Sequence, residues 1–146
     1  MLDGATGRLS LPSGFVVGPD TTLAHFKADA AYASARETVQ AKSFTICSID
    51  GGLHQGREVL TSLYFDGQAL RSVKLTFSSP LSSPAWREPP AEFAATKGVH
   101  DTLLALWLGR PHAKRDGDLQ YLLAWGEVWS CIDPRAGDAA ITVRYR

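Results

Sequence analysis

The hydrophobic pattern of the chain indicates one long helix, over residues Ala91–Leu108. Val99, Leu103 and Leu106 recur at the i, i+4 and i+7 spacing of a helix that buries one stripe of its surface. Gly109 follows the last apolar residue and can adopt the left-handed conformation that ends a helix. We therefore expect a long helix that lies on a large apolar surface.

Many of the remaining apolar residues alternate with polar ones, which is typical of half-buried β-strands. Asp66-Gly67 stands between two such segments and is a strong signal for a hairpin turn. Gly126 lies inside another segment, where it predicts a bulge. The strand-like segments cover residues 43–49, 58–65, 70–77, 119–132 and 139–145.

These elements predict an α+β fold in a single domain, residues 1–146. We expect a mainly antiparallel sheet of five or six strands, with the long helix packed on one face and a shorter N-terminal helix before the strands. A sheet covered by a helix on one face leaves its other face more open. That face is the expected binding surface.

Composition narrows the class of protein. The chain has 146 residues, and its 15 basic and 15 acidic side chains balance. A protein dedicated to nucleic acid usually carries a basic excess, so a nucleic-acid partner is not the first expectation. The longest apolar run, residues 103–108, is too short to span a membrane, and the N-terminal residues do not resemble a signal peptide. We expect a cytoplasmic protein in which Cys47 and Cys131 are reduced thiols.

The sequence offers little support for catalysis. His100-Asp101 is an ordinary pair of helix positions, in which Asp101 can pair with Lys97 one turn earlier at the surface. No zinc-binding spacing of His and Cys occurs, and no glycine-rich phosphate loop. We therefore expect no enzyme activity, no metal and no cofactor.

Three segments carry a family resemblance: LPSGFVV with TLAHF a few residues on, KGVHDTLLALWLGRP, and YLLAWGEVWSCIDPRAGDAAITVRY. In this order they resemble bacterial immunity proteins encoded beside polymorphic toxins, as in contact-dependent growth inhibition. The resemblance implies a protein that binds the C-terminal domain of one cognate toxin, with a nuclease as the expected toxin, and blocks it. It carries over no catalytic residues.

Binding of this kind needs aromatic anchors and complementary charge. Acidic groups would mimic phosphates if the toxin is a nuclease, although the neutral net charge of the chain argues against this. Trp129 is either such an anchor or a residue at the rim of the core. The candidate partner-binding residues are Trp86, Glu88, Glu92, Glu127, Trp129, Asp133 and Asp138.

Two other classes of function remain open. A nucleic-acid-binding sheet would stack bases on exposed aromatic rings and contact phosphates with basic side chains, all on one face. A small enzyme would need titratable groups that converge in a cavity between helix and sheet. The residues of the nucleic-acid hypothesis are Tyr64, Trp125 or Trp129, with Arg71, Lys74, Arg144 and Arg146.

Overall fold

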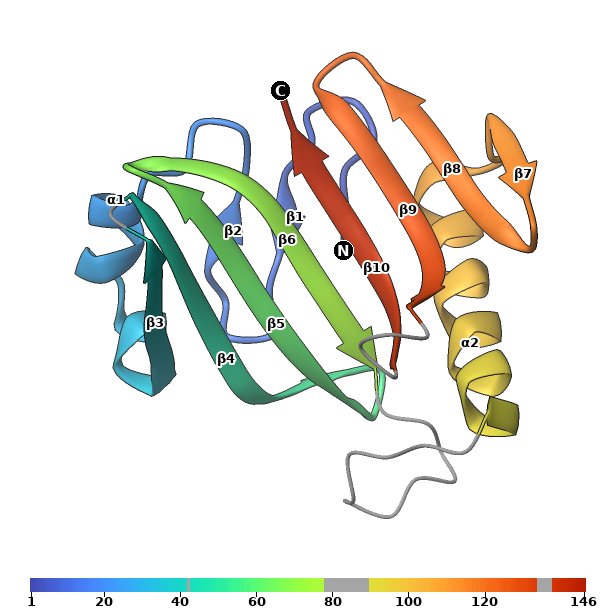
Figure 1. Ribbon diagram of the computed structural model, residues 1–146, viewed down its shortest axis with the longest axis horizontal. Helices are drawn as coiled ribbons and strands as arrows, with labels where there is room; N and C mark the ends of the chain where they lie inside the picture. The colour runs from blue at the N-terminus through green and yellow to red at the C-terminus, as the bar shows by residue number, and fades with distance from the viewer. Residues whose placement is uncertain (42, 78–89, 134–137) are drawn as a thin grey trace.

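One large antiparallel sheet dominates the structure, a computed structural model that describes residues 1–41, 43–77, 90–133 and 138–146 (Figure 1). Its strands are β3 (Ala35–Ala41), β4 (Phe44–His54), β5 (Arg57–Asp66), β6 (Ala69–Phe77), β7 (Ala113–Arg115), β8 (Asp118–Leu123), β9 (Gly126–Asp133) and β10 (Asp138–Tyr145). The eight strands follow the order β3-β4-β5-β6-β10-β9-β8-β7. The chain's last strand therefore lies in the middle of the sheet and joins an N-terminal meander to a C-terminal one.

All other described elements lie on the far side of the sheet in Figure 1. They are β1 (Leu9–Ser10), β2 (Val16–Val17), α1 (Leu23–Ala28), the 3-10 helix η1 (Ala30–Ser34) and α2 (Pro90–Leu108). α2 packs on β9, β10 and β6. No helix in the described ranges is long and apolar enough to cross a bilayer. The α+β class, the long helix on the sheet and the shorter N-terminal helix are confirmed.

The core lies between the sheet and these covering elements. One cross-strand row of six side chains, each with an exposed fraction of 0%, runs through β4, β5, β6, β10, β9 and β8. Burying one aliphatic or aromatic side chain contributes about 1.5–3 kcal/mol. The row is Cys47, Leu63, Val73, Val143, Val128 and Tyr121. It ties the two meanders into one sheet.

The predicted helix is confirmed, but its predicted buried stripe is confirmed only in part: Leu103 is buried and Val99 packs half-buried against the core. Gly109 has φ +76°, and its N–H donates to the Ala105 carbonyl at 3.0 Å, so the helix ends as expected. Leu106, however, is 71% exposed. Successive helical residues are about 100° apart around the axis, so a rotation that turns Leu104 and Trp107 toward the sheet turns Leu106 away. The same rotation buries Thr96, Lys97, His100, Leu103 and Leu104.

The predicted count of five or six strands is too low, because the sheet has eight. Segment 119–132 is two strands, β8 and β9, and not one. Gly126 begins β9 and forms no bulge within it; a Cβ at this position would overlap the carbonyl oxygen of Arg144 on β10. The edge strands β3 and β7 were also missed. All three residues of β7 are exposed and most of β3 is, so neither strand shows the alternation of a half-buried strand.

Candidate functional site

The sheet face turned away from the helices is not covered by any described element, and we call it the open face (Figure 1). Two cross-strand rows of side chains define it. The first row is Ser48, Ser62, Lys74, Thr142, Trp129 and Gln120. The second is Ile46, Tyr64, Ser72, Arg144, Glu127 and Leu122. These positions alternate along each strand with the buried core positions, so the face follows from the pleat of the sheet.

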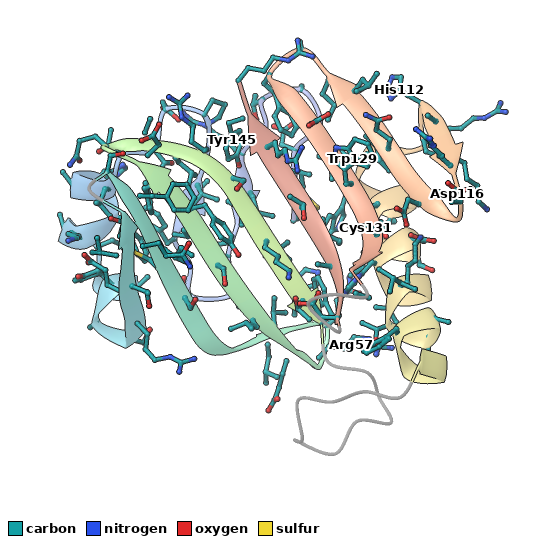
Figure 2. All side chains as sticks on the ribbon, in the orientation of Figure 1. Arg57, His112, Asp116, Trp129, Cys131 and Tyr145 are labelled. Atoms are coloured by element: carbon teal, nitrogen blue, oxygen red, sulfur yellow. The ribbon has the colours of Figure 1, made fainter. Side chains whose placement is uncertain are left out.

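Trp129 is the largest side chain on the β9 part of the open face (Figure 2). It is a direct cross-strand neighbour of Thr142 on β10 and Gln120 on β8. The residue is half-buried, and its indole Nε1 is buried without a hydrogen-bond partner among the described residues. Leu122, in the adjacent row, is 47% exposed. Trp129 therefore lies between polar neighbours with an exposed leucine close by.

Two ion pairs lie on the open face. Arg144 Nη1 donates to Glu127 Oε1 at 3.2 Å, and Lys74 Nζ donates to Asp138 Oδ2 at 2.7 Å. Both join neighbouring strands, since β10 lies between β6 and β9. The Arg144 side chain is 61% exposed and can still contact a bound protein. The side chains of Glu127, Lys74 and Asp138 are only 26–29% exposed. The charge of these four residues sums to zero.

The structure brings together three of the seven predicted partner-binding residues. Glu127, Trp129 and Asp138 all lie on the open face. Glu92 lies in α2, on the opposite side of the sheet. Asp133 ends β9, but its side chain lies outside the described part, and Trp86 and Glu88 lie outside the described residues altogether. The predicted acidic surface is only partly present on this face, because both described carboxylates are paired with cations.

Sequence reasoning missed Gln120 and Leu122 as members of this face. Their signal is the alternation within β8, where Leu119 and Tyr121 are buried and the residues that follow each of them point the other way. This alternation ends with β8, because a new strand begins at Gly126. A turn between Leu123 and Gly126 separates the two strands.

The residues of the nucleic-acid hypothesis divide into two groups. Tyr64, Trp129, Lys74 and Arg144 share the open face. Trp125 does not: its ring packs 5.6 Å from the Tyr145 ring, and its Nε1 donates to the Gly4 carbonyl at 2.9 Å. Arg71 lies beside the register shift between β5 and β6, and Arg146 follows the end of β10. The aromatic and basic residues that do meet are interleaved with carboxylates.

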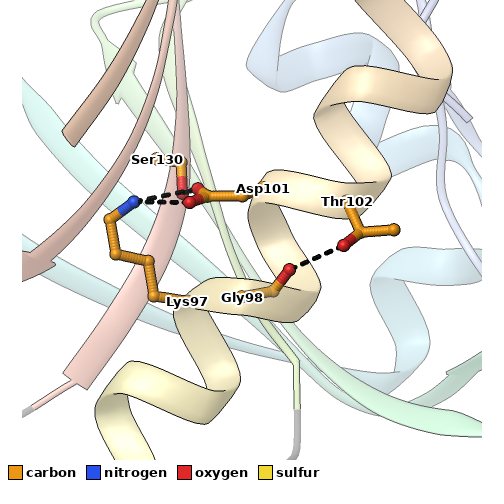
Figure 3. Close-up of polar contacts among 5 residues, drawn as sticks. All are labelled: Lys97, Gly98, Asp101, Thr102 and Ser130. Carbon is orange, nitrogen blue, oxygen red and sulfur yellow. Dashed lines mark hydrogen bonds and ion pairs between the residues drawn. The ribbon is translucent and has the colours of Figure 1, made fainter. Parts of the chain in front are cut away.

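The interface of α2 with the sheet contains a second polar cluster (Figure 3). Lys97 Nζ lies 2.9 Å from both carboxylate oxygens of Asp101, and Ser130 Oγ of β9 donates to Asp101 Oδ1 at 2.5 Å. The Lys97 side chain is 10% exposed and Ser130 is fully buried. The expected pairing of Lys97 with Asp101 is confirmed, but its expected surface position is wrong, because the pair faces the sheet.

His100 lies on the same side of α2 and is completely buried. Its Nε2 accepts a hydrogen bond from the Phe77 backbone N–H at 3.3 Å, and its ring packs edge-on against the Phe77 ring. Burial lowers the pKa of His100 from 6.5 to about 4. The imidazole is thus neutral at pH 7 and serves as a structural acceptor under the helix.

The cluster under α2 is poorly suited to catalysis. Ser130 and His100 are closed off from solvent, so a substrate cannot reach them. Burial raises the pKa of the Cys47 thiol, which disfavours the thiolate, and neither cysteine forms a disulfide. Within the described ranges, no group of three or more His, Cys, Asp or Glu could hold a metal ion.

The geometry therefore combines an uncovered sheet face that carries Trp129 with a closed polar cluster under α2. No family model, curated protein or solved structure matches the chain.

Proposed function

We propose that this protein is an immunity protein that binds the C-terminal domain of one cognate bacterial toxin through the open face and thereby neutralises it. The observation that carries the proposal is the position of Trp129, half-buried on a sheet face that no described element covers. The class of partner rests on the resemblance of three segments to immunity proteins. The choice of face rests on the geometry.

The composition of the open face supports protein recognition. Tryptophan, tyrosine and arginine dominate the energetic centres of protein interfaces, because each buries a large area and keeps a polar group for hydrogen bonding. The open face offers Trp129, Tyr64 and Arg144 in two adjacent cross-strand rows. The ion pairs beside them give alternating charge, which favours one partner over others and speeds association.

The paired carboxylates bear on how a nuclease toxin would be blocked. An inhibitor that imitates nucleic acid presents a dense row of unpaired acidic groups, as the phosphate backbone does. On the open face Glu127 is paired with Arg144, and Asp138 with Lys74. We infer that the toxin is held at a surface beside its active site and is not inhibited by phosphate mimicry.

The test is co-expression of the chain with the product of the adjacent upstream gene, followed by size exclusion and growth assays. The expected result is a stoichiometric complex and rescue of growth. Trp129→Ala should weaken the complex at least ~30-fold, as loss of a central anchor does. Leu122→Glu should weaken it as well. The matched control is Leu106→Glu, since Leu106 is exposed on the far side of the sheet.

The outcomes separate the two parts of the proposal. A complex that Leu106→Glu weakens and that Trp129→Ala leaves intact would keep the immunity function and overturn the face. A harmless neighbouring gene product that forms no complex would overturn the immunity function itself.

Nucleic-acid binding is the second candidate, because Tyr64, Trp129, Lys74 and Arg144 do share one face. It ranks second because both cations are already paired with carboxylates. Binding of single-stranded RNA, measured by fluorescence anisotropy at two salt concentrations, tests it. Tight binding that weakens steeply with salt and is lost in Trp129→Ala would favour this candidate.

A further inference from the structure

A cleft opens between the β4–β5 hairpin and α2, on the opposite side of the sheet from the open face. Its volume is about 360 Å³. His54 and Arg57 line it from the hairpin, and Gly98, Val99 and Leu103 line it from the helix. The walls from α2 are mainly apolar, with Thr102 as a polar exception, and the other polar side chains come from His54, Gln55 and Arg57 of the hairpin. Apolar walls with a few convergent polar groups are the usual makeup of a small-ligand site.

His54 and Arg57 lie next to each other on the hairpin. His54 and Arg57 are direct cross-strand partners, so their side chains project from the same face of the hairpin. The His54 ring packs edge-on against the rings of Trp107 and Phe77, at 5.7 and 6.0 Å, which fixes its orientation. Arg57 is labelled in Figure 2, at the end of the sheet beside α2.

Both residues carry a buried nitrogen without a partner. Neither His54 Nε2 nor Arg57 Nη1 has a hydrogen-bond partner within the described ranges. Arg57 forms no ion pair with any described residue, and its guanidinium group carries a positive charge. Burial lowers the pKa of His54, so its imidazole is neutral at pH 7 and has one N–H to donate. Arg57 thus lacks a counter-charge among the described residues, and an anion in the cleft would supply one.

We propose that this cleft binds a carboxylate group attached to a small apolar body, with the carboxylate held by Arg57 and His54 and the body placed against Val99 and Leu103. A carboxylate matches the planar fork of guanidinium and neutralises its single charge. Arg57 is the only charged residue among the described residues that line the cleft. A phosphate dianion would keep one negative charge uncompensated there.

The carboxylate could belong to a free metabolite or to the C-terminus of a peptide, and the test separates the two. The probes are butyrate, a tripeptide that ends in valine with a free carboxylate, the same tripeptide as an amide, and inorganic phosphate. Binding to the full chain is followed by the NMR shift of the His54 ring and by thermal unfolding. A saturable shift with butyrate, and none with the amide, is the expected result. A tighter response to the peptide acid than to butyrate would assign a peptide terminus.

Two variants and one control locate the site. Arg57→Gln should weaken butyrate binding at least ~10-fold, because the bidentate charged partner is lost. Gly98→Leu should block the cleft without removing the charge, since a Cβ on Gly98 meets no other atom within 4 Å and leucine favours a helix. Arg115→Gln removes a side chain that is 92% exposed on β7 and should bind as the wild type does.

The proposal is overturned if no carboxylate shifts the His54 resonance. It is also overturned if phosphate binds more tightly than butyrate, or if butyrate binds Gly98→Leu unchanged. The wild-type titration decides the matter even if Arg57→Gln does not fold. The result is independent of toxin binding, which is proposed for the opposite face.

Discussion

Lys97 donates to both carboxylate oxygens of Asp101 at 2.9 Å, and this pair faces β9 instead of solvent. Ser130 of β9 donates to the same carboxylate and is fully buried. The pair therefore connects the middle of α2 to β9. The pair shares the buried side of α2 with Leu103 and Leu104.

Removal of one partner from this pair should destabilise the protein. Asp101→Ala leaves the Lys97 ammonium, whose side chain is 10% exposed, without its counter-charge, so we expect a loss of about 1–3 kcal/mol in the free energy of unfolding. Urea unfolding followed by tryptophan fluorescence measures it. Arg115→Ala, in a pair whose side chains are 92% and 93% exposed, should cost less than about 0.5 kcal/mol. Equal effects of the two variants would contradict the buried role.

His100 should make stability depend on pH. Its pKa is 6.5 when exposed and about 4 in the fold, so between these values the unfolded chain binds more protons than the folded one. Stability is therefore lost as pH falls from 6.5 to about 4, by about 3 kcal/mol in total. Asp101 opposes this lowering of the His100 pKa, and Lys97 adds to it, each less strongly than burial acts.

The corresponding variant is His100→Gln, which keeps an acceptor for the Phe77 N–H but does not titrate. Its unfolding free energy should fall less steeply over this pH range than that of the wild type. The control His25→Gln replaces an exposed histidine of α1 and should preserve the wild-type slope. If the unfolding free energy of His100→Gln falls as steeply with pH as that of the wild type, protonation of carboxylates alone would cause the loss of stability.

Two glycines should respond oppositely to alanine. A Cβ at Gly126 would overlap the Arg144 carbonyl oxygen, so Gly126→Ala must push β9 away from β10, and we expect a loss of at least about 2 kcal/mol. Gly98 lies in the helix with open space around it, so Gly98→Ala should stabilise the protein by about 0.5–1 kcal/mol. Thermal unfolding of both variants measures this. A tolerated Gly126→Ala would mean that the two strands can separate at low cost.

A charge swap across the open face should separate stability from binding. Arg144→Glu places two carboxylates side by side, but the pair is largely exposed, so the cost should be below about 1 kcal/mol. Its association with the toxin domain should slow at least ~10-fold, because the exposed guanidinium is lost. The double variant Arg144→Glu with Glu127→Arg restores the internal pair but inverts the charge pattern. It should recover stability and remain slow to bind; recovery of both would place the interface elsewhere.

Local signals in the sequence were sufficient for most elements. Alternation located β4, β5, β6 and β10, and the Asp66-Gly67 signal located the β5–β6 hairpin. Gly109 ends α2 as expected. These features depend on residues a few positions apart, so a single sequence contains the information. Glu127 and Trp129 are two positions apart in β9, so the strand period places them on one face, although it does not show which strands flank them.

The tertiary structure alone decided the rest. Which side of α2 is buried depends on Ser130 and the core beneath the helix, so Leu106 is exposed and Lys97 is buried. The position of β10 between β6 and β9 depends on pairing between distant segments, and it is this order that joins Arg144 to Glu127 and Lys74 to Asp138. The sequence by itself determined the elements and the polarity of their faces, because these are local properties. Which elements become neighbours depends on contacts between residues far apart in the chain. The open face and the cleft beside α2 both follow from that arrangement.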